Sequence, residues 1–228
     1  RSNANTKGLN MRLFEKYRPK SLAEVVGQPK AVATIQRMID RGGYGGRAVW
    51  ISGASGTGKT TLARIIAGTV AGPSDTTEYD CARQVTVSEL ERISDMMQYR
   101  GMERQGGRAW IINESHGLSK AATELLLGLL ERLPAHVVVI FTTTKDGEEA
   151  LFEDNIDAHP LLSRCDVLSL TNQGLAKAFG ERCFQVAQAE GLDGVPIERY
   201  TRLAQNCKNN MRAMFNAVES GSLIGGVG

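Results

Sequence analysis

The chain has 228 residues, 42% of them hydrophobic, which suits one large α/β domain with a small second domain. Its formal net charge of +2 neither demands nor excludes a nucleic-acid partner, so any DNA contact has to come from local patches. No apolar run approaches the roughly 20 residues that span a membrane, and the N-terminus lacks the apolar core of a signal peptide, so we expect no membrane partner and a cytoplasmic location.

The four cysteines are scattered along the chain and form no C-x-x-C pair. This spacing argues against a zinc knuckle and against a disulfide framework. We therefore expect reduced thiols at Cys81, Cys165, Cys183 and Cys207.

The N-terminal part of the chain combines a tail, a polar segment and a helix. Ser2-Asn3-Ala4 is typical of a tag-cleavage remnant, so residues 1–10 are expected to be a tag remnant and a flexible N-terminus. The polar segment 13–28 ends in Val25-Val26 and a glycine, and it either wraps a nucleotide base or covers the domain edge. Pro29 suits a helix start, and apolar residues then recur at helical spacing until Arg41-Gly42-Gly43.

A glycine-rich motif follows the apolar run Val49-Trp50-Ile51. From Gly53 to Thr60 the chain matches G-x-x-x-x-G-K-[ST] between a predicted strand and a predicted helix, which disfavours an ordinary glycine turn. In such a loop, backbone N–H groups cradle phosphate oxygens, Lys59 reaches the β and γ phosphates, and the Thr60 hydroxyl ligates Mg²⁺. The sequence therefore predicts a site for ATP and Mg²⁺, with nucleotide-binding residues Gly53, Ser55, Gly56, Thr57, Gly58, Lys59, Thr60 and Thr61.

Two helices and a short strand are expected after this motif. The first helix is expected to run to about Gly72-Pro73, and the strand to cover residues 77–79. Ser88-Glu89-Leu90-Glu91 has the pattern of a capping box, so the second helix is expected to begin there and to end at Arg100-Gly101. Residues 100–108 carry Arg100, Arg104 and Arg108 and predict a basic loop, which is either merely solvated or in contact with DNA phosphates.

Two further apolar runs, 109–112 and 137–141, are typical of strands buried in a parallel sheet. Asn113-Glu114 follows the first run, and Thr142-Thr143-Thr144 follows the second. Ligands of open α/β sheets bind at the carboxyl ends of the strands. Both polar groups are therefore expected to converge on the phosphate loop.

The remaining pattern is mostly helical. Ser119 is expected to start a helix that ends at Pro134, with a core stripe formed by Leu125, Leu126, Leu129, Leu130 and Leu133. A polar segment at 145–159 precedes the last strand candidate, 167–170, and the chain from Thr171 predicts three helices, the last capped by Asn209 or Asn210. We expect an α/β nucleotide-binding domain over 11–170, a small all-α lid over 171–220 and a flexible tail over 221–228.

With these parts in this order, the chain resembles an AAA+ ATPase, and within that superfamily the small subunits of DNA polymerase clamp loaders, of the replication factor C small subunit or bacterial DNA polymerase III gamma-tau type. The resemblance covers nearly the whole chain and implies a three-layer αβα domain with a parallel sheet, followed by a helical lid domain. Ser163-Arg164-Cys165 is the sharpest marker of the clamp-loader branch. The other matching stretches are Lys16-Tyr17-Arg18-Pro19, Val25-Val26-Gly27-Gln28, the phosphate loop, Ile111-Ile112-Asn113-Glu114 and Thr142-Thr143.

The resemblance also implies roles for single residues. Glu114 would polarise the attacking water, and Thr143 or its neighbour Thr142 would sense the γ-phosphate or that water. Arg164 would be the arginine finger on the ATP of a neighbouring subunit, and such fingers are worth on the order of 10³ to 10⁵ in rate. Arg212 would be the second sensor arginine, which closes the lid on the nucleotide. The base and ribose pocket would be lined by Tyr17, Val25 and Val26.

Plainer interpretations exist for several of these residues. An arginine such as Arg164 usually lies at the surface without a special role, and only its Ser-Arg-Cys setting favours the finger. Arg212 is alternatively a solvated residue on a helix. The threonines are alternatively β-formers at a strand end, although three in a row favour a functional role.

The chain departs from the family pattern in three places. The family's second phosphate motif ends in Asp-Glu, but here it is Asn113-Glu114. Because an amide oxygen can accept from Mg²⁺-bound water but carries no charge, we expect weaker metal binding and slow or absent hydrolysis. The zinc module that bacterial relatives insert after the phosphate-loop helix is missing. The chain also ends after the lid without a collar domain, so it is either the first two domains of a longer protein or a shorter relative.

The resemblance implies an ATP-binding and ATP-hydrolysing module that assembles with homologous AAA+ subunits in a ring or spiral. Such a complex opens a sliding clamp and loads it at primer–template DNA. Two alternatives remain open. One is a non-hydrolysing regulatory subunit, which Asn113 favours. The other is an AAA+ motor of another DNA transaction such as branch migration, which the Ser-Arg-Cys triplet disfavours.

Overall fold

The fold is described from a computed structural model for residues 11–144, 146–149 and 158–223. The expected tag remnant at 1–10, parts of the polar segment 145–159 and the last five residues of the expected tail lie outside the described residues. The chain divides into two compact units, each described here by itself. One is built on a sheet and contains Ser21–Ala23 and Gln28–Thr171, and the other is helical.

The sheet of the first unit has five strands in the order β2-β3-β4-β1-β5, and every neighbouring pair is parallel. β1 lies between β4 and β5, and its last residue, Ser52, is in register with Thr143 and Ser169. The carboxyl ends of these three strands therefore lie together. The strands are β1 Arg47–Ser52, β2 Thr76–Tyr79, β3 Arg108–Ile112, β4 Val137–Thr143 and β5 Cys165–Ser169.

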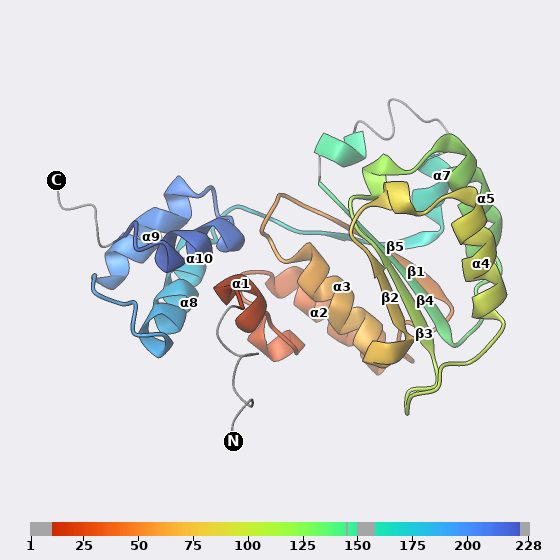
Figure 1. The fold of residues 1–228 in the computed structure, drawn as a ribbon, viewed down its shortest axis with the longest axis horizontal. Coiled ribbons are helices and arrows are strands. Elements are labelled where there is room, and N and C mark those ends of the chain that lie inside the picture. The colour runs from red at the N-terminus through yellow and green to blue at the C-terminus, as the bar shows by residue number, and fades with distance from the viewer. Residues whose placement is uncertain (1–10, 145, 150–157, 224–228) are drawn as a thin grey trace, which may run out of the picture. The chain divides into compact units, whose positions relative to one another are not determined.

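Helices cover both faces of this sheet, which explains why its central strands are continuously apolar. In Figure 1, α2 (Pro29–Asp40) and α3 (Lys59–Gly68) lie on one side, while α4 (Val87–Met97), α5 (Lys120–Leu130) and α7 (Ala158–Ser163) lie on the other. Trp50, Trp110 and Phe141 are fully buried in the core between the sheet and the second group of helices. Single 3₁₀ turns cover η1 Leu22–Glu24, η2 Pro73–Asp75, η3 Ala82–Gln84 and η4 Ser115–Gly117.

Four helix boundaries differ from the sequence expectations: one each of α3 and α5, and both of α4. α5 ends at Leu130 rather than at Pro134. α3 ends at Gly68 rather than near Gly72-Pro73, because the Thr69 hydroxyl donates to the Ile66 carbonyl (2.7 Å) and the chain then turns into η2. α4 is capped by Thr86 rather than Ser88, since the Thr86 side chain accepts from the Glu89 N–H (3.3 Å), and it ends at Met97 rather than at Arg100-Gly101.

Two side-chain expectations were also wrong. Leu125 is exposed, because it points away from the helix face that carries Leu126 and Leu130, and that face is completed by Ala122 and Thr123. Arg108 is the first residue of β3 rather than part of a loop. Its guanidinium donates to the Tyr99 and Arg100 carbonyls (2.9 and 3.4 Å), so it holds the preceding loop in place.

The second unit has a helical core, to which the N-terminal segment contributes. Leu13 is buried in the same apolar cluster as Phe179, Tyr200 and Met214. The described residues up to Lys20, together with Glu24–Gly27, therefore group with the helices from Asn172 onward, whereas the sequence had suggested a nucleotide domain from residue 11. The helices are α1 Leu13–Lys16, α8 Ala176–Ala189, α9 Ile197–Asn206 and α10 Met211–Glu219.

The last helix of this unit begins as the sequence predicts. The Asn210 side chain caps α10 by accepting from the Ala213 N–H (3.1 Å). Across the ranges that the structure describes, no helix is both long enough and apolar enough to cross a membrane.

Candidate functional site

The glycine-rich loop joins β1 to α3, and its glycines serve two purposes. Gly56 and Gly58 have φ of 75° and 102°, in the left-handed region that glycine adopts without strain. Gly53 provides space, because a Cβ there would lie 2.9 Å from Cβ of Leu170. Gly58 is also the N-cap of the 10-residue helix α3, whose first N–H groups and positive dipole end face this loop.

Lys59 is buried and reaches back across this loop. Its Nζ donates to the carbonyls of Gly53 (2.9 Å) and Ala54 (3.0 Å), and the Thr57 hydroxyl donates to the same Ala54 carbonyl (2.8 Å). An ammonium group, a helix N-terminus and left-handed glycines thus meet in one loop. This donor set fits a polyphosphate. Ser55 is exposed at the tip of the loop, and Thr61 is buried on α3.

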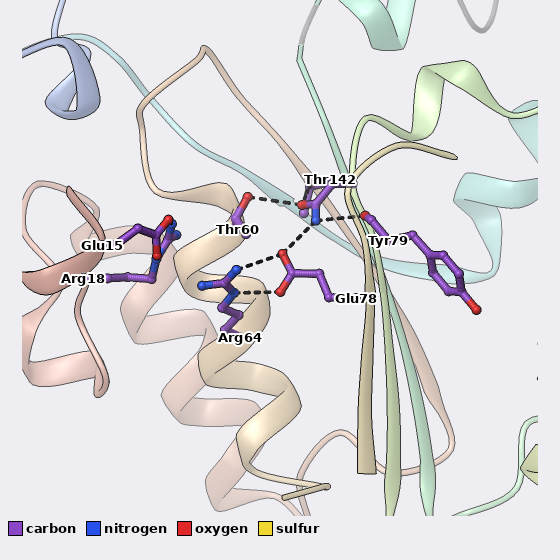
Figure 2. A network of polar contacts seen from close by, with 8 residues as sticks. Glu15, Arg18, Thr60, Arg64, Glu78, Tyr79 and Thr142 are labelled. Atoms are coloured by element: carbon purple, nitrogen blue, oxygen red, sulfur yellow. Dashed lines mark hydrogen bonds and ion pairs between the residues drawn. The ribbon is translucent and has the colours of Figure 1, made fainter. Parts of the chain in front are cut away.

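Asn113 joins three segments at the carboxyl edge of the sheet, and Figure 2 labels its partners Thr60, Glu78, Tyr79 and Thr142. Its Oδ1 accepts from the hydroxyls of Thr60 (3.1 Å) and Thr142 (2.8 Å). Its Nδ2 donates to Oε1 of Glu78 (3.0 Å) and to the Tyr79 carbonyl (3.1 Å). Since carboxylates and carbonyls cannot donate, the amide has a single satisfactory orientation. The expected convergence of the two strand ends on the phosphate loop is therefore observed.

Glu114 and Thr143 both lie close to the side chain of His116. Nδ1 of His116 is 3.5 Å from Oε2 of Glu114 and 3.3 Å from the Thr143 hydroxyl, which also donates to the Thr144 carbonyl (3.2 Å). Glu114 has φ 51° and ψ 50°, an uncommon conformation for a residue with a side chain, and its side chain is half-exposed. Thr142 and Thr143 therefore differ: the first contacts Asn113 and the second contacts the surroundings of Glu114.

Gln28 connects the phosphate loop to the end of β5. Its Nε2 donates to the carbonyls of Thr57 (3.4 Å) and Thr171 (2.8 Å), and its Oε1 accepts from the Thr171 N–H (3.2 Å). The side chain is buried, so these bonds are well shielded from water. Gln28 is thus a structural support of the loop.

The Ser163-Arg164-Cys165 triplet closes the end of α7. The Ser163 hydroxyl donates to the Pro160 carbonyl (2.8 Å), as does Nη1 of Arg164 (2.9 Å), and Sγ of Cys165 donates to the Leu161 carbonyl (3.2 Å). Burial raises the pKa of Cys165 to about 12, so it is a packing residue rather than a reactive thiol. The three side chains satisfy the last carbonyls of the helix and so fix the place of Arg164.

Arg164 also forms an ion pair with Glu131, which follows the last residue of α5. Its Nε and Nη2 lie 3.1 and 2.5 Å from Oε1 of Glu131. The hydrogen bond from Arg164 lowers the pKa of Glu131 below its ordinary value. Both side chains are accessible, with 30% of Arg164 and 56% of Glu131 exposed.

Four of the predicted nucleotide-binding residues belong to the helical unit. The Tyr17 hydroxyl donates to Glu190, which raises the pKa of Tyr17, and Lys16 pairs with the same carboxylate. The guanidinium of Arg212 lies over the Phe14 ring, 5.3 Å from its centroid. The roles of Tyr17, Val25, Val26 and Arg212 toward a nucleotide remain predictions.

The oxygen atoms at the sheet edge suit Mg²⁺. Within the described ranges, no cluster of three or more His, Cys, Asp or Glu side chains could hold a metal ion. Mg²⁺ is commonly held by phosphates, waters and only one or two protein oxygens. Of the predicted metal residues, Thr60 supplies such an oxygen, because its hydroxyl donates to Asn113 and keeps its own lone pairs. Both lone pairs of Oδ1 of Asn113 accept from the hydroxyls of Thr60 and Thr142, so this amide orients Thr60 in the arrangement observed.

Sequence reasoning missed three side chains of this region: Glu78, His116 and Glu131. Each touches a residue that the motifs did identify. His116 lies only two residues after Glu114, so its closeness in the sequence was a signal that could have identified it. Glu78 and Glu131 carry no local signal, because their partners are far along the chain.

Comparison with known sequences gives related proteins. Residues 2–99 match the family model described as the TIP49 P-loop domain. DNA polymerase III subunit gamma/tau of Mycobacterium tuberculosis is 32% identical over 159 residues, which cover 59% of this chain and 27% of that protein. Subunit tau of Salmonella typhimurium is 28% identical over 236 residues, covering 78% and 36%. The chain thus spans about a quarter to a third of the length of these relatives.

Comparison with solved structures shows the fold. A single-residue variant of RuvB from Thermotoga maritima has a TM-score of 0.68 at 22% identity, over 89% of this chain and 64% of that one. A DNA polymerase III gamma subunit-related protein from the same organism has a TM-score of 0.51 at 14% identity, covering 79% and 69%.

Together these likenesses confirm the expected fold class, a P-loop AAA+ αβα domain followed by a helical region. They also confirm the resemblance to clamp-loader subunits of the DNA polymerase III gamma/tau type.

Proposed function

We propose that this chain is the ATP-binding and ATP-hydrolysing AAA+ module of a clamp-loader-type complex, which opens a sliding clamp and loads it at primer–template DNA. The hydrogen-bonded cluster around Asn113 carries the proposal, because it joins the phosphate loop to the ends of β3 and β4. These are the parts that position a nucleotide, a metal ion and a water in P-loop ATPases. The similarity to DNA polymerase III gamma/tau subunits supports the clamp-loader assignment.

In this proposal the phosphates of ATP lie on the loop and on the N-terminus of α3. Lys59 exchanges its two neutral carbonyl acceptors, Gly53 and Ala54, for charged phosphate oxygens. Hydrogen bonds between charged groups are about twice as strong as neutral ones, which favours the exchange. Thr60 donates its proton to Asn113, so its oxygen lone pairs remain available for Mg²⁺. When bound, Mg²⁺ supplies neutralisation of the phosphate charge.

Glu114 is the proposed general base. Glu114 lies two residues after the end of β3, and its half-exposed carboxylate shares His116 with Thr143, so a water between Glu114 and Thr143 would have an acceptor and a polar neighbour. In the helical unit, Tyr17, Val25, Val26 and Arg212 are proposed to contact the base, the ribose and the phosphates.

Arg164 is proposed to act on the ATP of a neighbouring AAA+ subunit in a ring or spiral. Its surface pair with Glu131 leaves it accessible to such a partner. We further propose a cytoplasmic location, because the four cysteines are free thiols, as is usual in reducing compartments.

Turnover as a function of protein concentration tests this function. We expect Mg²⁺-dependent ATP hydrolysis whose specific activity rises with concentration, and which primed DNA with a sliding clamp stimulates more than branched DNA. Lys59→Ala is the negative control. Preferential stimulation by branched DNA would instead indicate another AAA+ motor.

Asn113 favours a second candidate function, a regulatory subunit that binds ATP without hydrolysing it. The discriminating measurement is retention of unhydrolysed ATP on the purified protein after incubation with Mg²⁺ at high protein concentration. Retained ATP without phosphate release supports the regulatory subunit. Release of phosphate that rises more steeply than the protein concentration supports the motor.

A further inference from the structure

Asn113 is connected through Glu78 to an arginine on α3. Arg64 donates to the Glu78 carboxylate twice, from Nε to Oε2 (2.7 Å) and from Nη2 to Oε1 (3.2 Å). The same Oε1 accepts from Nδ2 of Asn113 (3.0 Å). Figure 2 shows this line of contacts running from α3 across the end of β2 toward Thr60 and Thr142.

We propose that Glu78 is a positioning residue for Asn113. Because of the Glu78 carboxylate, position 113 functions with an amide side chain rather than with a carboxylate. The inference rests on the proposed function, because its consequence is the orientation of the Thr60 hydroxyl toward Mg²⁺. Glu78 acts through Asn113 and is not itself assigned a contact with nucleotide or metal.

The first step of the argument is orientation. Glu78 and the Tyr79 carbonyl only accept, so they hold Nδ2 of Asn113 on their side and turn Oδ1 toward Thr60 and Thr142. Without the Glu78 carboxylate, the amide loses one of the two acceptors that define its orientation. A reversed amide would donate to Thr60 and occupy one of the two hydroxyl lone pairs that are otherwise available to the metal.

The second step concerns charge. A carboxylate at position 113 would place two carboxylate oxygens about as close as Nδ2 and Oε1 are now, with no proton between them. Like charges at this separation repel strongly, most of all where one group is buried, and Asn113 is 7% exposed. The carboxylate in contact with this corner is therefore supplied by Glu78 of β2 rather than by position 113 at the end of β3.

The third step separates this role from that of an ordinary surface ion pair. Arg64 and Glu78 are 43% and 20% exposed, and an exposed pair alone contributes little to stability. What distinguishes Glu78 is its contact with a buried amide whose other hydrogen bonds reach the phosphate loop. Asn113 is therefore matched to its neighbour, and replacing it by aspartate alone does not improve the site.

The test is a double-mutant cycle on the whole chain with Asn113→Asp, Glu78→Gln and the double variant. In the double variant the amide and the carboxylate exchange places, so one donor still faces one acceptor and the charge is unchanged. The matched control is Asp166→Asn, which also converts a paired carboxylate, bound to Arg47 at 3.3 Å, into an amide. Two quantities are measured: thermal stability without nucleotide, and ATP affinity with and without Mg²⁺.

We expect Asn113→Asp to weaken binding of Mg²⁺-ATP on the order of tenfold and to lower the Tm, with part of both losses restored in the double variant, where the Tyr79 carbonyl still lacks its donor. Glu78→Gln alone keeps an oxygen that can accept from Nδ2 of Asn113, so it is expected to change both quantities less than Asn113→Asp does, and the control is expected to change neither. If Asn113→Asp alone is as stable as the native chain and binds Mg²⁺-ATP as tightly, or if the two substitutions are additive, Glu78 does not position Asn113.

The stability cycle distinguishes the two proposals. Absence of ATP binding by the native chain would contradict the proposed function, while the Tm values would still report whether positions 78 and 113 are coupled. Normal ATP binding without coupling in the Tm values would overturn only the present inference.

Discussion

Asn113 and Arg164 both belong to the sheet unit, but their side chains are held in place in opposite ways. Asn113 is buried and forms hydrogen bonds with side chains or backbone from α3, β2 and β4. Arg164 is held at the surface by one exposed carboxylate and one carbonyl. The buried cluster fixes the position of Oδ1 of Asn113. The ion pair of Arg164 with Glu131 lies at the surface, so Arg164 can leave it for another partner at little cost in free energy. This difference fits the proposed roles, in which Asn113 serves the nucleotide site of its own chain and Arg164 serves that of a neighbouring subunit.

The largest expected effect is on turnover, from Arg164→Ala. Loss of the proposed finger is expected to reduce ATP hydrolysis by on the order of 10³-fold or more, while the Tm and ATP affinity change little because Arg164 is partly exposed and its ion pair lies at the surface. Phosphate release, thermal unfolding and ATP binding check these three outcomes. Arg92→Ala removes another arginine of a surface pair and is the control. Equal loss in both variants would contradict a special role for Arg164.

The action of this arginine on a neighbour has its own readout. Mixing Arg164→Ala with Lys59→Ala is expected to restore part of the activity, because mixed interfaces pair an intact finger with an intact phosphate loop. Steady-state hydrolysis of the mixture at several ratios measures this recovery. Activity that never exceeds that of the separate variants would indicate that Arg164 does not work between subunits.

Lys59→Ala tests the phosphate loop, whose lysine is buried. Loss of a charged hydrogen bond to phosphate is expected to weaken ATP binding by about 3 kcal/mol, or about 100-fold. Titration with a fluorescent ATP analogue measures the affinity. Lys30→Ala, at an exposed position near the start of α2, is the matched control and should bind normally. Unchanged ATP affinity in Lys59→Ala would refute the assignment of the loop.

Thr142→Val removes one donor of the buried cluster and keeps the shape of the side chain. Because Oδ1 of Asn113 then keeps only Thr60, we expect a loss of about 1 kcal/mol in the free energy of unfolding. Urea unfolding measures it. Thr77→Val, on a half-buried strand position, is the control and should stay within about 0.5 kcal/mol of the native chain. A larger loss in the control would show that strand packing, not the Asn113 cluster, is responsible.

The smallest effect is expected from Glu131→Gln, which weakens the surface pair. The Tm should not change measurably, and the protein concentration for half-maximal turnover should fall by less than about fivefold. Because Arg164 lowers the pKa of Glu131, the native pair is intact at neutral pH and is lost only as the pH falls through that lowered pKa. A large drop in Tm at neutral pH would show that the pair is structural.

The sequence by itself determined the features that depend on adjacent residues. The phosphate loop is continuous from Gly53 to Thr60, and the left-handed backbone conformations of Gly56 and Gly58 are specified locally by this motif. β1, β3 and β4 could be read from their apolar runs, whereas β5 covers Cys165–Ser169 rather than the expected 167–170. Ser119 and Asn210 cap their helices as expected. Helix ends were less predictable, since Thr86 and Ser88 both suit a cap and the extended backbone of Thr86 decided between them.

Only the tertiary structure decided which distant side chains meet. Asn113 and Glu78 are 35 residues apart, and they touch because β2 pairs with β3, a strand order that no local pattern specifies. Arg164 and Glu131 meet because α7 packs beside α5, and Leu13 joins the helical unit because that core buries it. Local backbone preference depends on a few neighbouring residues, whereas the partner of a polar side chain depends on the packing of the elements that carry it.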